Sequence, residues 1–102
     1  AKKDLTATSV TTLYTAPALT TAIVKSILVS EDSGNADTIT VTITDAESSP
    51  AVFSLFKTKA VGANTTIELL TAPIIVQTGE ILKVTAATAN RLHVVASILE
   101  VT

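Results

Sequence analysis

The sequence predicts an all-β fold: a single-domain antiparallel β-sandwich, jelly-roll-like, with about eight short strands. The chain has 102 residues, which suits one domain. Hydrophobic residues make up 47% of it, yet they include only two Phe, one Tyr and no Trp, so the core must consist of Val, Ile, Leu and Ala. Threonine occurs 19 times, and β-branched residues fit a pleated strand better than a helix.

The first third of the chain is expected to hold an arm and two strands. Residues 1–9 are polar and lack a period, so we expect an N-terminal arm, with the sandwich domain over 10–102. A short strand is expected from Val10 to Tyr14. Pro17, which cannot donate to a ladder, either ends this strand or places it on an edge. The run from Thr21 to Ser30 contains three consecutive apolar residues, which predicts either a strand covered on both faces or a bulge.

The clearest strand runs from Thr38 to Thr44. Its aliphatic side chains alternate with threonines, so they share one face. Turns rich in Gly, Pro, Asn, Asp and Ser separate the later strands. Those strands are expected over Val52–Lys59, Thr65–Leu70, Ile74–Val76, Ile81–Ala86 and Leu92–Val101. Residues 84–90 are the candidate for one helical turn, but Thr85 and Thr88 disfavour it.

The single histidine, His93, lies among apolar residues of the last expected strand. A general base needs an orienting partner, and a metal site needs further ligands. The sequence pattern supplies neither, so we interpret His93 as a strand or interface residue. An enzyme would need a polar pocket around His93 with a matching carboxylate.

An acidic connection over 31–37 contains Glu31, Asp32, Asn35 and Asp37. Oxygen-rich loops can bind Ca²⁺, but the spacing does not match an EF-hand, so we expect a solvated hairpin loop. Asp45 and Glu47 flank the next turn and are expected to face solvent. No catalytic residues, cofactor or metal ligands are therefore assigned.

The composition also disfavours several classes of binding partner. The net charge is −2, and the one basic pair, Lys2 and Lys3, is followed by Asp4, which disfavours nucleic acid. No apolar run is long enough for a membrane span, and no secretory signal is visible, so we expect a product of the cytoplasm. The aromatic residues Tyr14, Phe53 and Phe56 are few for a sugar-binding platform, and the Phe pair is expected in the core.

Three segments resemble small structural proteins of tailed-bacteriophage virions. They are LYTAPALTTAIVKSILVSEDSG (13–34), TITVTI (38–43) and GANTTIELLTAPIIVQTGEILKVTA (62–86). The resemblance implies a β-sandwich of the kind found in capsid cement, or decoration, proteins, which sit on the outer shell, commonly as trimers. Glu31 and Asp32 depart from the family pattern, which more often has a short neutral turn there.

The resemblance implies a non-enzymatic virion protein, made in the host cytoplasm, that binds the major capsid protein or other virion proteins. A homo-oligomer, preferably a trimer, is expected, with no membrane partner. The arm provides the candidate shell or subunit contacts, Lys2, Lys3, Asp4 and Leu5. Deleting residues 1–9 is then expected to weaken attachment without unfolding the domain. The alternatives are a tail, baseplate or head-fibre component and, behind these, a carbohydrate-binding receptor module.

Overall fold

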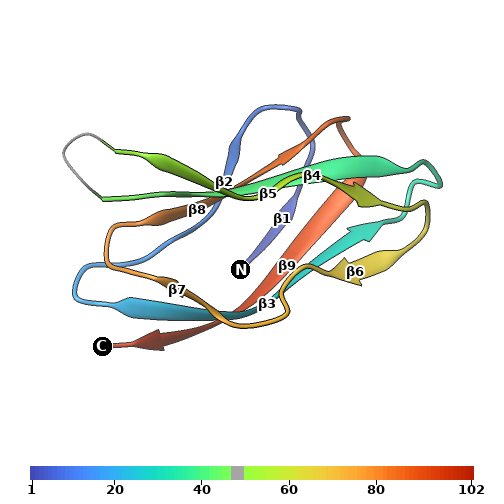
Figure 1. Ribbon diagram of the computed structural model, residues 1–102. Helices are drawn as coiled ribbons and strands as arrows, with labels where there is room; N and C mark the ends of the chain where they lie inside the picture. Colours follow the sequence, from blue (N-terminus) through green and yellow to red (C-terminus); the bar gives the residue numbers. More distant parts are fainter. Residues whose placement is uncertain (47–49) are drawn as a thin grey trace.

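The computed structural model describes residues 1–46 and 50–102, which form nine β-strands in two antiparallel sheets (Figure 1). The strands are β1 (Lys2–Asp4), β2 (Thr11–Thr15), β3 (Thr21–Glu31), β4 (Asp37–Thr44), β5 (Val52–Val61), β6 (Thr66–Glu68), β7 (Ile74–Val76), β8 (Ile81–Ala86) and β9 (Leu92–Val101). Each of the eight expected strands corresponds to one of these. The ninth, β1, falls in the expected arm.

The strand order is that of a jelly roll. Sheet A has the order β1-β9-β3-β6, with β7 also paired to β3, and sheet B has the order β2-β8-β4-β5. The pairs are therefore nested: β4 with β5, β3 with β6 and β7, β2 with β8, and β1 with β9. Such nesting is what results when one long hairpin is rolled into two facing sheets. The prediction of a jelly-roll-like sandwich is confirmed.

The core lies between the sheets and is aliphatic, as the composition requires. Alternate residues of β3, β4, β8 and β9 point inward, and Val24, Ile39 and Leu82 are among those fully buried. The apolar run 27–29 alternates too, because Ile27 and Val29 are buried while Leu28 faces outward. A bulge just before it, between Val24 and Ser26, sets this register.

The prediction of an N-terminal arm is wrong for residues 2–5. Lys2, Lys3 and Asp4 form β1, which pairs with β9 in sheet A. Leu5 is 1% exposed, and its backbone bonds to the Leu92 carbonyl and the Asn90 amide. Polar residues suit an edge strand, because much of the surface of such a strand is in contact with water. The single apolar residue Leu5 therefore anchors β1.

The segment over 84–90 forms no helical turn. β8 continues through Ala86, and the chain then turns, with Asn90 in the left-handed region at φ 64°. Across residues 1–46 and 50–102 there is no helix long and apolar enough to cross a membrane.

Candidate functional site

The outer face of sheet A exposes apolar side chains over several neighbouring strands. Leu28 of β3, Val95 and Leu99 of β9, and Ile75 of β7 are each between 39% and 50% exposed. Leu28 pairs with Val95, and Ile23 pairs with both Leu99 and Ile75, so these residues form rows on one surface. The paired Ser26 and Ser97 lie between the two apolar rows. Several exposed apolar side chains on one sheet face are typical of a surface that binds another protein.

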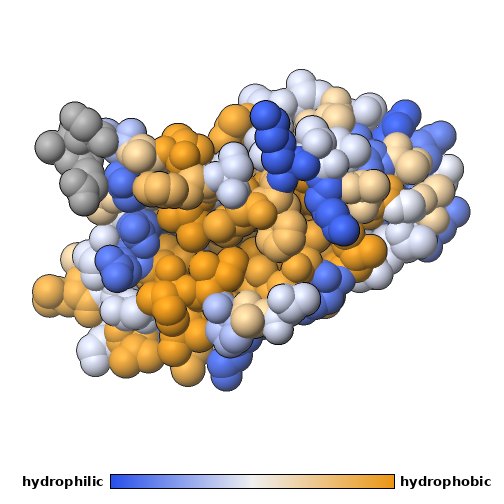
Figure 2. Space-filling model, viewed as in Figure 1, coloured by the Kyte–Doolittle hydropathy of each residue, from blue (hydrophilic) through white to orange (hydrophobic). Residues whose placement is uncertain are grey.

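A second apolar surface follows the open edge of the sandwich. A groove of about 320 Å³ lies between β5 and the segment that links β6 to β7. Its lining is Leu55, Phe56, Leu69, Leu70, Thr71, Ala72 and Ile74. Figure 2 shows hydrophobic surface extending across the middle of this side of the molecule. The two sheets are therefore incompletely closed along this edge.

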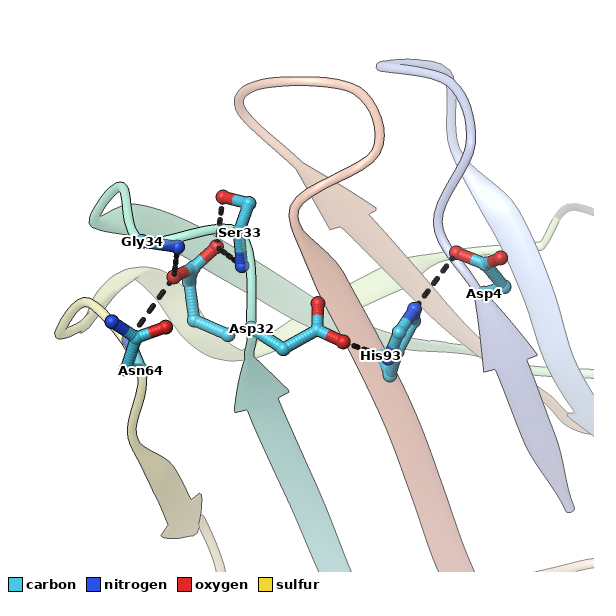
Figure 3. Close-up of polar contacts among 7 residues, drawn as sticks. Asp4, Asp32, Ser33, Gly34, Asn64 and His93 are labelled. Carbon is cyan, nitrogen blue, oxygen red and sulfur yellow. Dashed lines mark hydrogen bonds and ion pairs between the residues drawn. The ribbon is translucent and has the colours of Figure 1, made fainter.

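A polar cluster, made of Asp4, His93 and Asp32, adjoins the apolar rows at one end of sheet A (Figure 3). His93 Nε2 lies 3.3 Å from Asp4 Oδ1, and His93 Nδ1 lies 3.8 Å from Asp32 Oδ2. Both ring nitrogens thus face carboxylates, and neither is directed at a nucleophile. The cluster lies on an open sheet face, where such ion pairs each contribute about 0–1 kcal/mol. The cluster joins His93 of β9 to Asp4 of β1 and to Asp32, which follows β3. His93 is thus a strand residue, one of the two roles expected for it.

Glu31 is the residue whose environment differs most from the expected solvated loop. Its side chain is buried, and its carboxylate accepts hydrogen bonds from the amides of Ser33 (2.9 Å), Gly34 (3.0 Å) and Asn64 (3.1 Å), and from the Ser33 hydroxyl. Burial alone raises the pKa of this carboxyl, but these hydrogen bonds outweigh it and lower the pKa to about 2. Glu31 therefore joins the β3–β4 connection to the β5–β6 turn.

Asp37 has a similar structural role at the start of β4. Its two carboxylate oxygens accept hydrogen bonds from the amides of Thr38 (2.8 Å) and Thr88 (3.0 Å). Arg91 adds a hydrogen bond to the Ala36 carbonyl at 3.0 Å. The prediction of a solvated loop over 31–37 is thus wrong for Glu31 and Asp37, whereas Asp32 and Asn35 are exposed.

The next acidic turn is described only in part. Asp45 accepts a hydrogen bond from the Ala51 amide at 3.0 Å, and it is half-buried rather than solvent-facing. Glu47, expected to face solvent, lies outside the described residues. In the part of the chain that is described, no group of three His, Cys, Asp or Glu side chains is placed to hold a metal ion.

The three aromatic side chains belong to two strands of sheet B, Tyr14 to β2 and both Phe to β5. Tyr14 of β2 donates a hydrogen bond to Glu100 of β9 at 2.5 Å, which links sheet B to sheet A. Burial, together with this contact to Glu100, raises the pKa of Tyr14 to about 12. Phe56 packs against the core, as expected, but Phe53 is 55% exposed, so its expected place in the core is wrong.

The candidate contact residues at the N-terminus divide into two groups. Lys2, Lys3 and Asp4 are exposed on β1, an edge strand of sheet A. Leu5 is buried and therefore unable to touch a partner, so its assignment as a contact residue is wrong.

We compared the chain with models of protein families, with curated proteins and with solved structures, and none of the three comparisons gave a match. The function is therefore inferred from the sequence and from the surfaces described above.

The outer face of sheet A was not identified from sequence. Its residues belong to five strands, and only their pairing brings them together. The alternation of Val95, Ser97, Leu99 and Val101 in the last strand gave a partial signal, because one set of alternate residues had to face away from the core.

Proposed function

We propose that this chain is a non-enzymatic structural protein of a tailed-bacteriophage virion, and more specifically a capsid cement protein that binds the outer shell and stabilises it. The observation that carries the proposal is the surface of the domain. A sandwich of only 102 residues exposes apolar side chains on three strands of one sheet face and along one open edge. Such surface suits binding to other proteins.

The proposed partner is a phage particle because three segments resemble virion proteins. These segments are 13–34, 38–43 and 62–86. The jelly roll also occurs in viral capsid domains, although that fold serves many functions and does not specify one. A partner that binds only the assembled shell stabilises it by RT ln(1 + [L]/Kd) at each site. Many copies on one particle add these contributions.

Copy number in purified particles tests the proposal. Quantitative mass spectrometry would compare this chain with the major shell protein. A simple ratio to the shell protein, at hundreds of copies, is expected for a cement protein. A few tens of copies or fewer would assign the chain to the tail, baseplate or head fibres, and its absence from particles would overturn the virion role.

The edge strand β1 supplies the first contact residue to test. We propose that Lys3, exposed on β1, contributes to shell attachment, since a charged edge strand is accessible to a partner. Lys3→Glu is expected to weaken reattachment of the purified protein to stripped particles. Lys59→Glu, an exposed lysine of β5, is the matched control. An equal loss of reattachment in both variants would show that attachment depends on the net charge of the protein and not on Lys3.

Deleting residues 1–9 would not separate a lost contact from a lost part of the fold. Removing residues 1–9 also removes β1 and the buried Leu5, so the truncated protein would lose stability as well as any contact. Point variants of Lys2, Lys3 and Asp4 separate the two effects, because these side chains are exposed.

A further inference from the structure

One row of residues crosses the outer face of sheet A from edge to edge. Lys2 of β1 pairs with Val95 of β9, Val95 pairs with Leu28 of β3, and Leu28 pairs with Glu68 of β6. Directly paired residues project from the same face of a sheet. The row therefore has a cation at one edge, two exposed apolar side chains in the middle, and an anion at the other edge.

The negative charge at the β6 edge is held in place. The Glu68 carboxylate accepts hydrogen bonds from the amides of Ile27 (2.8 Å) and Leu70 (3.2 Å), and from the Ser26 hydroxyl. Burial opposes ionisation, but these bonds prevail and lower the pKa of Glu68. A carboxylate has about four lone-pair sites, so it retains capacity for another donor.

The neighbouring rows differ in polarity along the strands. On one side, Asp4 pairs with His93, His93 with Ser30, and Ser30 with Thr66, which makes a polar row. Toward the other end of the strands, Leu99, Ile23 and Ile75 make an apolar row. The face is thus polar at one end and apolar toward the other, with the paired Ser97 and Ser26 between. The opposite charges at the two edges belong to the Lys2–Glu68 row, and Asp4 lies beside Lys2 at the β1 edge.

We propose that a second copy of this chain binds face to face on the outer face of sheet A, about a two-fold axis that runs along the strands between β9 and β3. This rotation keeps each row opposite itself and exchanges its two ends. Lys2 then meets the partner's Glu68, and Leu28 meets the partner's Val95. The charge complementarity within the row identifies the occupant as the same surface of another copy.

The other rows fit the same axis. Leu99 meets the partner's Ile23, and His93 meets the partner's Ser30, so apolar residues face apolar ones and hydrogen-bonding groups face each other. An axis across the strands would instead place the apolar row against the polar one. A trimer, which the resemblance implies, joins two different surfaces of each copy, whereas this face is complementary to itself.

The mass of the purified full chain in solution tests the proposal. Analytical ultracentrifugation is expected to show a species of 21 kDa, twice the 10.5 kDa of one chain (2 × 10.5). Leu28→Asp is expected to give monomers, because it places a charge at the centre of the interface. Phe53→Asp, an exposed apolar residue of sheet B, is the matched control and is expected to remain dimeric. Circular dichroism would verify that both variants fold.

Charge reversal tests the orientation of the two copies. Lys2→Glu is expected to weaken dimerisation by about tenfold or more, since two interface pairs become repulsive. Lys59→Glu is the control, because Lys59 is an exposed lysine of β5 in sheet B and so lies away from this face. Glu68→Lys alone is expected to weaken dimerisation, and an equimolar mixture of Lys2→Glu and Glu68→Lys chains to restore it. If Glu68→Lys does not fold, the comparison of Lys2→Glu with Lys59→Glu decides.

Three results would overturn the proposal. They are a monomer at every concentration up to about 1 mM, a trimer of 31.5 kDa (3 × 10.5), and a dimer that Leu28→Asp leaves intact. If Leu28→Asp abolishes particle binding in a protein that is always monomeric, the face belongs to the shell contact instead. The copy number in particles does not depend on these results, so the two proposals fail separately.

Discussion

At the scale of single residues, Glu31 shows how a carboxylate can stabilise a fold without acting in a site. It is buried at the end of β3, where backbone amides of two different connections donate to it. Hydrogen bonds to the charged form favour ionisation, which is the physical cause of its pKa of about 2. Its contribution to stability therefore depends on pH.

We predict that acid destabilises the protein partly through Glu31. The pKa of this carboxyl is about 2 when folded and 4.5 in its ordinary state. The stabilisation is thus complete above about pH 4.5 and is lost as pH falls towards about 2. Glu31→Gln is expected to lower the free energy of unfolding near pH 7, with a difference from wild type that shrinks in acid. Urea denaturation at several pH values would measure it.

Asp32→Asn is the matched control for this prediction, because Asp32 is the neighbouring carboxylate and its side chain is 68% exposed. We expect it to change the free energy of unfolding by less than Glu31→Gln near pH 7. An acid transition of equal size in wild type and Glu31→Gln would contradict the role assigned to Glu31.

Tyr14 gives a prediction at alkaline pH. It is the only tyrosine, so the absorbance of the phenolate reports on it alone. The native protein is expected to titrate near pH 12 and the denatured chain near the ordinary value of 10.0. Because the pKa of Tyr14 is raised in the folded state, this residue contributes to the free energy of unfolding below about pH 10. That contribution is lost as pH rises to about 12. Glu100→Gln is expected to lower the native value, and a native midpoint near 10 would disprove the contact.

At the scale of elements, β1 depends on one core residue. We predict that Leu5→Ala lowers the free energy of unfolding by about 2–4 kcal/mol, because it leaves a cavity where a fully buried side chain was. Lys3→Ala, an exposed residue of the same segment, is expected to change it by less than about 0.5 kcal/mol. Chemical denaturation would compare the two variants. Similar losses of unfolding free energy in both would mean that residues 1–5 are an arm after all.

The turn that leads into β8 requires glycine at position 79. Gly79 has φ 81°, and a Cβ there would lie 3.0 Å from the Cβ of Ala46. Gly79→Ala is expected to cost at least about 1–2 kcal/mol of unfolding free energy, because the left-handed conformation is unfavourable for a residue with a Cβ. Gly62→Ala is the control, since its nearest contact would be an ordinary 3.4 Å to Thr65. Equal costs in thermal or chemical denaturation would contradict this.

The strands themselves were predictable, and their pairing was not. Period-two alternation located Thr38–Thr44 directly, because it depends only on neighbouring residues. The arm prediction failed because Lys2 pairs with Val95, and no local pattern reports a contact across that distance in sequence. Glu31 was misjudged for the same reason, since one of its donors is Asn64 on another turn. The residues of the candidate faces could be recognised as apolar, but not as neighbours.

At the scale of the whole molecule, the nested pairing predicts an order of local opening. Strands β3, β9, β4 and β8 each have paired neighbours on both sides, whereas β1 lies at an edge and has three paired residues. In hydrogen exchange followed by NMR, amides of the four central strands are expected to exchange only on global unfolding, and those of β1 by local opening. Equal protection of β1 and β3 would contradict this.

Nested pairing also has a consequence during synthesis on the ribosome. Lys2 and its partner Val95 are separated by 93 positions (95 − 2), so the outermost pair forms last although β1 is made first. At 5–20 residues per second, β1 and Leu5 wait roughly 5 to 20 s for β9 to be made. During that time the inward-facing aliphatic residues of the early strands remain uncovered. The nascent chain is thus expected to be a substrate for chaperones that bind exposed apolar segments.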